Sequence, residues 1–141
     1  MKNTEFTISL SISSLKDVVT AECAWIDTCN MAVLPPIVNP ATGKDLTADI
    51  LTAVNSAVKS ISGYVSSYSE KGDIVAIDIV TPAMRVNNIT SIRKCVEQFV
   101  IYHTLKALYD AQPQAKHICI GFSEKSKEVL LSVKQLLASA Q

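Results

Sequence analysis

The sequence has few glycines and none of the glycine-rich motifs that bind phosphate. Its four glycines are scattered and form neither GxGxxG nor GxxxxGK[ST], the spacings that place backbone N–H groups against a phosphate. HExxH, GxSxG and zinc-ligand patterns are also missing, and with them the usual signatures of zinc peptidases and serine hydrolases. We therefore expect no enzyme active site, no cofactor and no metal centre.

Net charge is also lacking, because thirteen Lys and Arg residues are balanced by thirteen Asp and Glu residues. A neutral chain lacks the positive field that attracts a phosphate backbone, so we expect no sequence-specific binding of nucleic acid. The net charge of the whole chain does not reveal a local basic patch. Neutrality also weakens the repulsion between copies of the chain, which favours self-association.

Long apolar runs are absent as well. The longest run without a charged or strongly polar side chain is Met31 to Val38, which is interrupted by Pro35 and Pro36 and is too short to cross a bilayer. The first residues alternate apolar side chains with Ser and Thr, unlike a signal peptide. The four cysteines lack CxxC spacing. We therefore expect no membrane contact, and free buried thiols in a reducing compartment.

The chain has 141 residues, of which 48% are hydrophobic and 18% charged, values typical of a single globular domain over residues 1–141. Within it we predict an extended arm or strand over 1–13, a long proline-rich loop over 30–44 and a helical body over 45–140. A loop of that length in a small domain is usually functional or is ordered by a partner.

The clearest strand pattern lies near the N-terminus. Four apolar residues there alternate with Thr and Ser, namely Phe6, Ile8, Leu10 and Ile12. This alternation predicts a strand with one apolar face, and a single strand is not stable in water. It pairs either with a second predicted strand near residues 74–80 or, by strand addition, with a neighbouring subunit. The apolar residues of the second strand are Val75, Ile77 and Ile79.

Apolar residues at helical spacing predict four helices, over residues 14–27, 47–68, 89–111 and 123–140. Thr47 and Ser123 are the predicted N-caps of the second and fourth helices, and Gly63 is an alternative end for the second. The third helix would be about 33 Å long, enough to span the whole domain. The expected fold class is mainly α: a small bundle of about four helices around a long central helix, with a minor β element from the N-terminal strand and the strand near 74–80.

Three polar residues have both a structural and a functional interpretation. His103 lies mid-helix beside aromatic residues, which favours a core or interface histidine over a general base. His117 and Cys119 would share one face of a strand, where a Cys–His pair can activate a thiolate; without an orienting third group, a small enzyme is the weaker hypothesis. Arg85 is either a solvated loop residue or one half of an intersubunit ion pair.

A series of features follows in order along residues 45–140. A helix leads to a tyrosine-bearing segment with Tyr64 and Tyr68, and an extended segment follows from Ile77 to Pro82. The long helix has an aromatic-aliphatic centre from Phe99 to Tyr102, and a closing helix contains residues 126–137. This order resembles the head–tail connector (adaptor) and neck proteins of tailed phages, as found in phages and prophages of gut bacteria.

The resemblance implies a structural virion protein without enzymatic turnover. It would assemble in the host cytoplasm as a homo-oligomeric ring between portal and tail, contact portal and tail or neck proteins, and surround the path of the DNA. The alternative is a non-enzymatic cytoplasmic adaptor or regulatory module that docks a protein partner through an exposed strand. The candidate subunit-interface residues are Phe6, Ile8, Leu10, Ile12, Pro35, Pro36, Val75, Ile77, Ile79 and Arg85.

Overall fold

The structure is a computed structural model that describes residues 4–29, 46–81, 86–110 and 115–138, without the side chains of 27–29 and 86–88. It contains four α-helices, a short 3-10 helix and a three-stranded antiparallel sheet, so the predicted mainly α class is confirmed. In chain order the elements are β1 (Thr4–Ser11), α1 (Ile12–Cys29), α2 (Thr47–Ser60), η1 (Ser62–Tyr64), β2 (Val65–Lys71), β3 (Ile74–Thr81), α3 (Val86–Asp110) and α4 (Lys116–Ala138).

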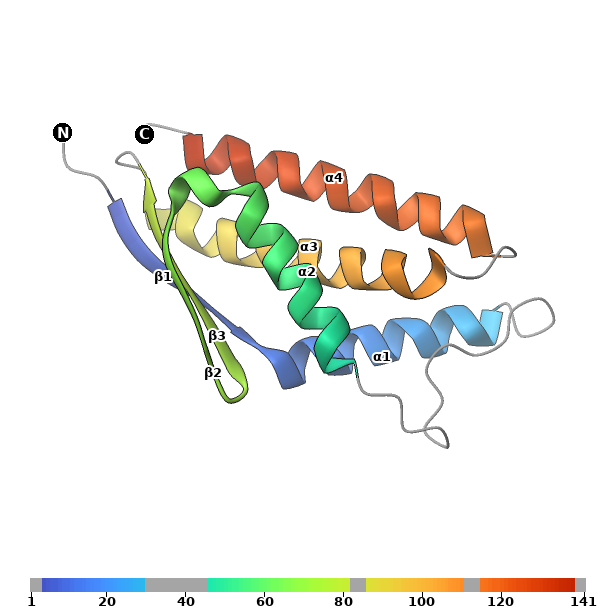
Figure 1. The fold of residues 1–141 in the computed structure, drawn as a ribbon. Coiled ribbons are helices and arrows are strands. Elements are labelled where there is room, and N and C mark those ends of the chain that lie inside the picture. Colours follow the sequence, from blue (N-terminus) through green and yellow to red (C-terminus); the bar gives the residue numbers. More distant parts are fainter. Residues whose placement is uncertain (1–3, 30–45, 82–85, 111–114, 139–141) are drawn as a thin grey trace.

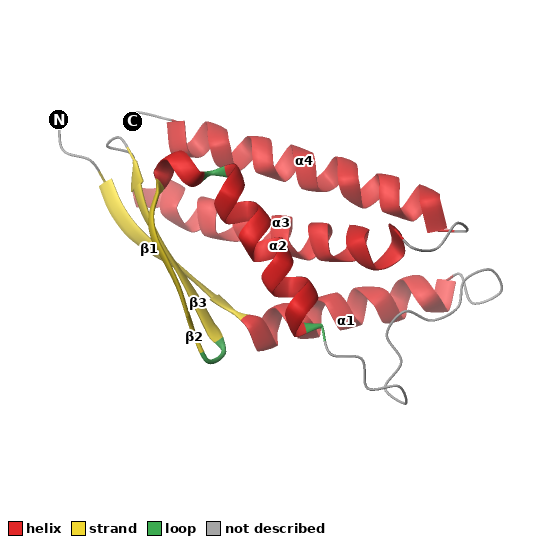
Figure 2. Ribbon diagram, viewed as in Figure 1, coloured by secondary structure: helices red, strands yellow, loops and turns green. Residues whose placement is uncertain are grey.

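The sheet lies at one end of the molecule and the helices extend away from it (Figure 1). Helices α3 and α4 lie side by side in opposite directions, and α2 crosses α3. Helix α3 contacts the other three helices and also β1. Figure 2 distinguishes the strands (yellow) from the helices (red), which extend to one side of the sheet. No helix in the described part of the chain combines the length and the apolar content that crossing a membrane requires.

The N-terminal strand pairs within the chain, which is the first of the two alternatives. Strands β1 and β2 each lie antiparallel to β3, in the order β1-β3-β2. Ile8 lies opposite Ile77 and Leu10 lies opposite Val75. These four side chains are buried on the face that packs against the helices, so the sheet completes the hydrophobic core.

The second predicted helix is too long. Its buried residues follow the helical spacing expected of one face, namely Ile50, Ala53, Val54 and Ala57. The helix ends at Ser60, close to Gly63, which was the alternative end. Val65 and Tyr68 continue the apolar spacing but lie in β2. Among the described residues of the predicted helical body, a β-hairpin therefore lies between α2 and α3.

The hairpin depends on its turn. Gly72 has a φ of 60°, the left-handed conformation that glycine adopts without the steric cost of a Cβ atom. A Gly-Asp pair between two extended segments is a recognised hairpin signal, and Gly72-Asp73 is the feature that would have revealed β2.

Both predicted N-caps are wrong. Helix α4 begins at Lys116, so Ser123 lies inside it, and the hydroxyl of Ser126 donates to the Ser123 carbonyl (2.8 Å). The helix starts earlier because Phe122, in its second turn, is buried against the core. Thr47 is the first residue of α2 and not its cap; its hydroxyl accepts a hydrogen bond from Lys16 Nζ (3.1 Å).

Asp73 caps helix α1 from the hairpin turn. The Ile12 N–H donates to the Asp73 carbonyl (2.8 Å), and the Ser13 N–H donates to its carboxylate (2.8 Å). The hydroxyl of Ser11 also donates to that carboxylate (2.8 Å) and accepts from the Ser14 N–H (3.3 Å). The first turn of α1 has no acidic residue of its own, so Asp73 supplies the negative charge that the helix dipole favours.

We expect Asp73→Asn to lower the urea midpoint of unfolding at pH 7, because it removes the charge that the α1 N-terminus stabilises. The hydroxyls of Ser13 and then Ser11, followed by the Ser13 N–H, hold the pKa of Asp73 below its ordinary value of 3.8. A lowered folded-state pKa contributes stability above the unfolded-state pKa, and that stability is lost as pH falls through the folded-state pKa.

The difference between wild type and Asp73→Asn should therefore shrink as the pH falls below about 4. Urea titrations followed by circular dichroism from pH 7 to pH 2.5 measure it. Asp17→Asn, which alters an exposed carboxylate on the same helix, is the matched control. Equal midpoints for wild type and Asp73→Asn at pH 7 would contradict this assignment.

Candidate functional site

The aliphatic members of the predicted subunit interface are buried within this chain. Each of these side chains is at most 5% exposed and lies in the core of this chain: Ile8, Leu10, Ile12, Val75, Ile77 and Ile79. The apolar faces of the two strands are covered by the helices of the same chain, so these side chains are not available to a neighbouring subunit in this fold. Phe6 is only partly buried, whereas Pro35, Pro36 and Arg85 lie outside the described residues.

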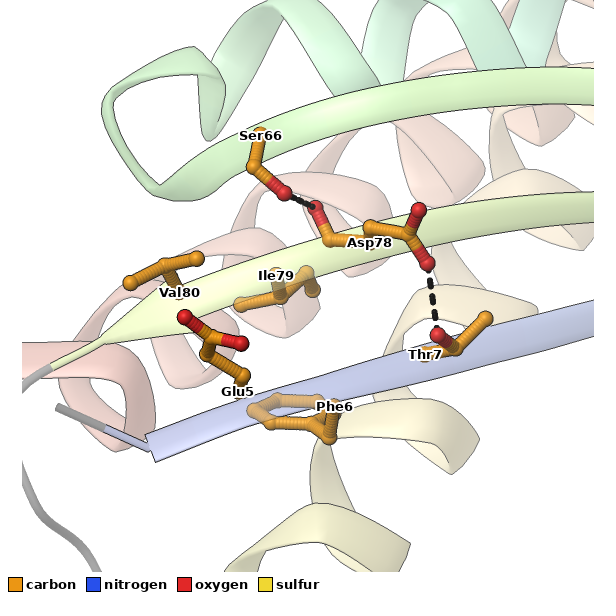
Figure 3. Close-up of a pocket in the computed structure, with 7 residues that line it drawn as sticks. All are labelled: Glu5, Phe6, Thr7, Ser66, Asp78, Ile79 and Val80. Carbon is orange, nitrogen blue, oxygen red and sulfur yellow. Dashed lines mark hydrogen bonds between the residues drawn. The ribbon is translucent and has the colours of Figure 1, made fainter.

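A hollow on the sheet reaches its outer face and is lined by two carboxylates, those of Glu5 and Asp78 (Figure 3). The Thr7 hydroxyl donates to Asp78 Oδ1 (2.5 Å), the Ser67 hydroxyl donates to Oδ2, and the Ser66 hydroxyl donates to the Asp78 carbonyl (3.2 Å). The hydroxyls of Ser67 and then Thr7 lower the pKa of Asp78. An ionised carboxylate engaged by hydroxyls from both flanking strands holds the sheet together and is a poor general acid or base.

A longer depression runs between α1 on one side and α3 and α4 on the other. Three adjoining hollows form it, beginning beside β1 and ending near the start of α4. Val18 and Ile101 line both the first and the second hollow, and Ile26, Phe122 and Lys125 line both the second and the third. Because these residues are shared, the hollows are continuous, and we call them the helical groove.

Aromatic rings and a cation form the middle of the helical groove. The Tyr102 and Phe122 rings are stacked with centroids 6.0 Å apart. The Lys125 ammonium lies 5.7 Å from the Tyr102 centroid and 5.6 Å from that of Phe122, within the range of a cation–π interaction. The middle of the groove therefore combines two aromatic rings with a positive charge, and Glu22 of α1 lines the same hollow.

Helix α1, which forms one wall of the helical groove, carries two exposed apolar side chains. Val18 is 43% exposed and Trp25 is 68% exposed. Trp25 is the only tryptophan of the chain, and a tryptophan this exposed is typical of a contact surface, since large aromatic residues dominate interface energetics. Apolar spacing along the helix predicted over 14–27 includes Trp25 and does not reveal its exposure. The available signal was Glu22, an acidic residue three positions before Trp25.

The surroundings of His103, His117 and Cys119 do not favour a catalytic role. The His103 ring stacks on Phe99 with centroids 5.4 Å apart, and its pKa is lowered by burial and then by Lys106. The extended conformation assumed for His117 and Cys119 is wrong, because both lie in α4. Two residues apart on a helix, they are rotated by about 200° from each other, so they do not share a face.

The Cys119 thiol is also electrostatically unsuited to nucleophilic attack. It donates a hydrogen bond to Asp110 (3.5 Å). Burial and then the Asp110 carboxylate raise its pKa, whereas a nucleophilic cysteine needs a lowered pKa. The geometry therefore gives no support to the hypothesis of a small enzyme built on His117 and Cys119.

Across residues 4–29, 46–81, 86–110 and 115–138, no group of three or more His, Cys, Asp or Glu side chains is arranged to hold a metal ion. Comparison of the chain with family models, curated proteins and solved structures found no match. The helical groove, with its aromatic middle and exposed tryptophan, is therefore the candidate functional site on its own geometry.

Proposed function

We propose that this protein is a structural subunit of a tailed-phage particle, part of the head–tail connector or neck ring between portal and tail. The observation that carries the proposal is the helical groove with its aromatic middle, together with the exposed Val18 and Trp25 on α1, which forms one wall of the groove. Surfaces of this kind mark contacts with other proteins. The order of helices and extended segments resembles that of connector proteins, and this resemblance suggests the head–tail connector as the particular assembly.

The proposed subunit works by packing and has no enzymatic turnover. We propose that α3 is its central helix, since α1, α2, α4 and β1 all contact it. A rigid body of this kind suits a particle component whose copies keep one shape while they form a ring. In this account the ring assembles in the host cytoplasm, remains in the virion and surrounds the path of the DNA.

Electron microscopy and light scattering of the purified protein, alone and mixed with the portal protein encoded near its gene, test the proposal. We expect closed rings, or a discrete complex with the portal. Alanine substitution of Trp25 should weaken that complex, while Leu131→Ala, which removes an exposed leucine (57%) outside the helical groove, should not. A strictly monomeric protein that engages neither portal nor tail components would overturn the proposal.

A second candidate function, a cytoplasmic adaptor that docks a peptide, is favoured by the edges of the sheet. The strand order β1-β3-β2 places β1 and β2 at the edges, and an edge strand can accept an added strand. The two functions differ in genetic setting: neighbouring genes for portal, capsid and tail proteins favour the connector subunit, and their absence favours the adaptor.

A further inference from the structure

Strand β1 forms one edge of the sheet (Figure 1), and its register shows which of its backbone groups point outward. The Ile12 N–H donates to the Asp73 carbonyl (2.8 Å), in the register that pairs β1 with β3. Because residues of an antiparallel strand bond alternately to its two sides, every second residue before Ile12 also bonds to β3. The N–H and carbonyl groups of Glu5, Thr7 and Ser9 therefore point away from β3. Among the described residues, these N–H groups have no hydrogen-bond partner, and we call this side of the strand the β1 edge.

The β1 edge lacks the features that keep edge strands from pairing with other chains, which are lysines, prolines, bulges and short length. Strand β2, at the opposite edge, has a register shift between Val65 and Ser67 and ends at Lys71. Strand β1 is eight residues long, contains neither lysine nor proline and pairs with β3 without a register shift. Of the two edges, β1 is therefore the one suited to receive an added strand.

The helices leave space beside the β1 edge. The first hollow of the helical groove is lined by Ser9 and Ser11 of β1 and by Arg93 and Glu97 of α3. Arg93 and Glu97 form an ion pair (3.6 Å), so the charges of this hollow are balanced. The hollow therefore does not repel an added strand that carries one carboxylate.

We propose that the β1 edge pairs antiparallel with β1 of a second copy of this chain, centred on Thr7. The two three-stranded sheets then become continuous across a two-fold axis. Thr7 lies opposite its counterpart, and Glu5 of each copy lies opposite Ser9 of the other, so the outward backbone groups of these residues bond across the contact. Phe6 lies opposite Ile8, which continues the apolar face of the sheet.

The residues of β1 favour this occupant and this register. A slip by one residue would place apolar side chains opposite hydroxyl-bearing ones. Centring on Ile8 would place Glu5 opposite Ser11, whose hydroxyl donates to the Asp73 carboxylate (2.8 Å), and so bring two like charges together. Centring on Thr7 keeps these charges apart. It also forms Thr–Thr and aromatic–β-branched pairs, both of which stabilise neighbouring strands.

This pairing rests on the proposed function, since it identifies one partner of a packing subunit. It joins copies two by two through their sheets, which are at one end of the molecule. The aromatic middle of the helical groove lies outside this contact and remains for ring and portal contacts. The zero net charge of the chain allows the close approach of two copies.

A proline at residue 9 tests the pairing and leaves the hydrogen bonds between β1 and β3 intact. The Ser9 N–H points away from β3, so Ser9→Pro removes an outward donor and places a ring where the second strand would lie. We expect the dimer dissociation constant to rise about tenfold or more. Sedimentation velocity over a concentration series measures it, and circular dichroism verifies that the variant is folded.

Glu70→Pro is the matched control at the other edge of the sheet. By the same alternation, the Glu70 N–H points away from β3, so this variant removes an outward donor from β2. It also removes the acceptor of the exposed Tyr68 hydroxyl. We expect it to leave the dimer dissociation constant unchanged.

Charge substitutions test the register without altering the backbone. Ser9→Glu places a carboxylate opposite Glu5 of the other copy at two symmetric positions, so we expect the dimer to weaken about three- to tenfold. Adding Glu5→Lys restores opposite charges and should return the constant to within about threefold of the original value. Ser69→Glu, the same change at an exposed serine of β2, should have no effect on the constant.

Three results would overturn the pairing: a protein that is monomeric at all concentrations, a folded Ser9→Pro variant that dimerises as tightly as the wild type, or a double variant no better than Ser9→Glu. Adding the portal protein separates the pairing from the proposed function. If Ser9→Pro dissociates the dimer but no portal or tail component is ever bound, the pairing stands and the connector function is wrong. If Ser9→Pro weakens portal binding and leaves self-association unchanged, the β1 edge binds the portal, and the pairing is wrong while the connector function stands.

Discussion

Replacing Ile77 with alanine is expected to lower the free energy of unfolding by about 2–5 kcal/mol, the range for truncating a buried aliphatic side chain. Ile77 is fully buried and lies at the middle of β3, opposite Ile8 on one side and Tyr68 on the other. Its removal leaves a cavity between the sheet and the helices, which the surrounding side chains fill only in part. Since a domain of this size has a total stability of about 5–15 kcal/mol, the loss is a large fraction of it.

Ile74→Ala is the matched control on the same strand. Ile74 is 43% exposed and faces away from the core, so its truncation should cost only about 0.5 kcal/mol or less. Urea unfolding followed by circular dichroism gives both values. Similar losses for the two variants would show that β3 does not bury the face assigned to it.

Thr81→Val is expected to lower the free energy of unfolding by about 1–3 kcal/mol, the cost of leaving a buried acceptor without its donor. Thr81 is buried (2% exposed), and its hydroxyl donates to the carbonyl of Leu137 near the end of α4. The last carbonyls of a helix have no donor within the helix, so Thr81 satisfies one of them. Together with Asp73 at the other end of β3, it attaches the central strand to two helices.

The valine variant keeps the shape of the side chain, so its effect isolates the hydrogen bond. Urea titration gives the stability change, and amide hydrogen exchange should show faster opening of the last turn of α4. Thr52→Val, at an exposed threonine whose hydroxyl bonds within α2 (2.9 Å to Ala48), should change stability much less. An unaltered exchange rate in the last turn of α4 would contradict the role of Thr81.

Strands β1 and β3 were predictable because their apolar residues alternate or form a short run closed by turn residues. Strand β2 was not, for a physical reason. Its edge position needs few apolar side chains, and the residues Val65 and Tyr68 happen to continue the spacing of the preceding helix. Only the Gly72-Asp73 turn distinguishes the two conformations, since a left-handed glycine reverses the chain into a hairpin.

The interface residues show what a single sequence leaves open. The alternation of Ile8 and Leu10 identifies which side chains need to be buried, but it does not show which chain buries them. Here the helices of the same chain bury them. Trp25 shows the reverse case, an apolar residue in a helical stripe that remains exposed. The helical groove is formed by helices distant in sequence, so spacing along one helix does not reveal it.

The fluorescence of Trp25 tests most directly the claim that the helical groove is where other chains pack. Trp25 is the only tryptophan of the protein, so its emission reports on this site alone. We predict that the emission shifts to shorter wavelength, and that quenching by iodide falls, over the same concentration range in which sedimentation or added portal protein shows assembly. If assembly proceeds while Trp25 keeps the emission and quenching of a solvent-exposed indole, the helical groove is not the contact surface.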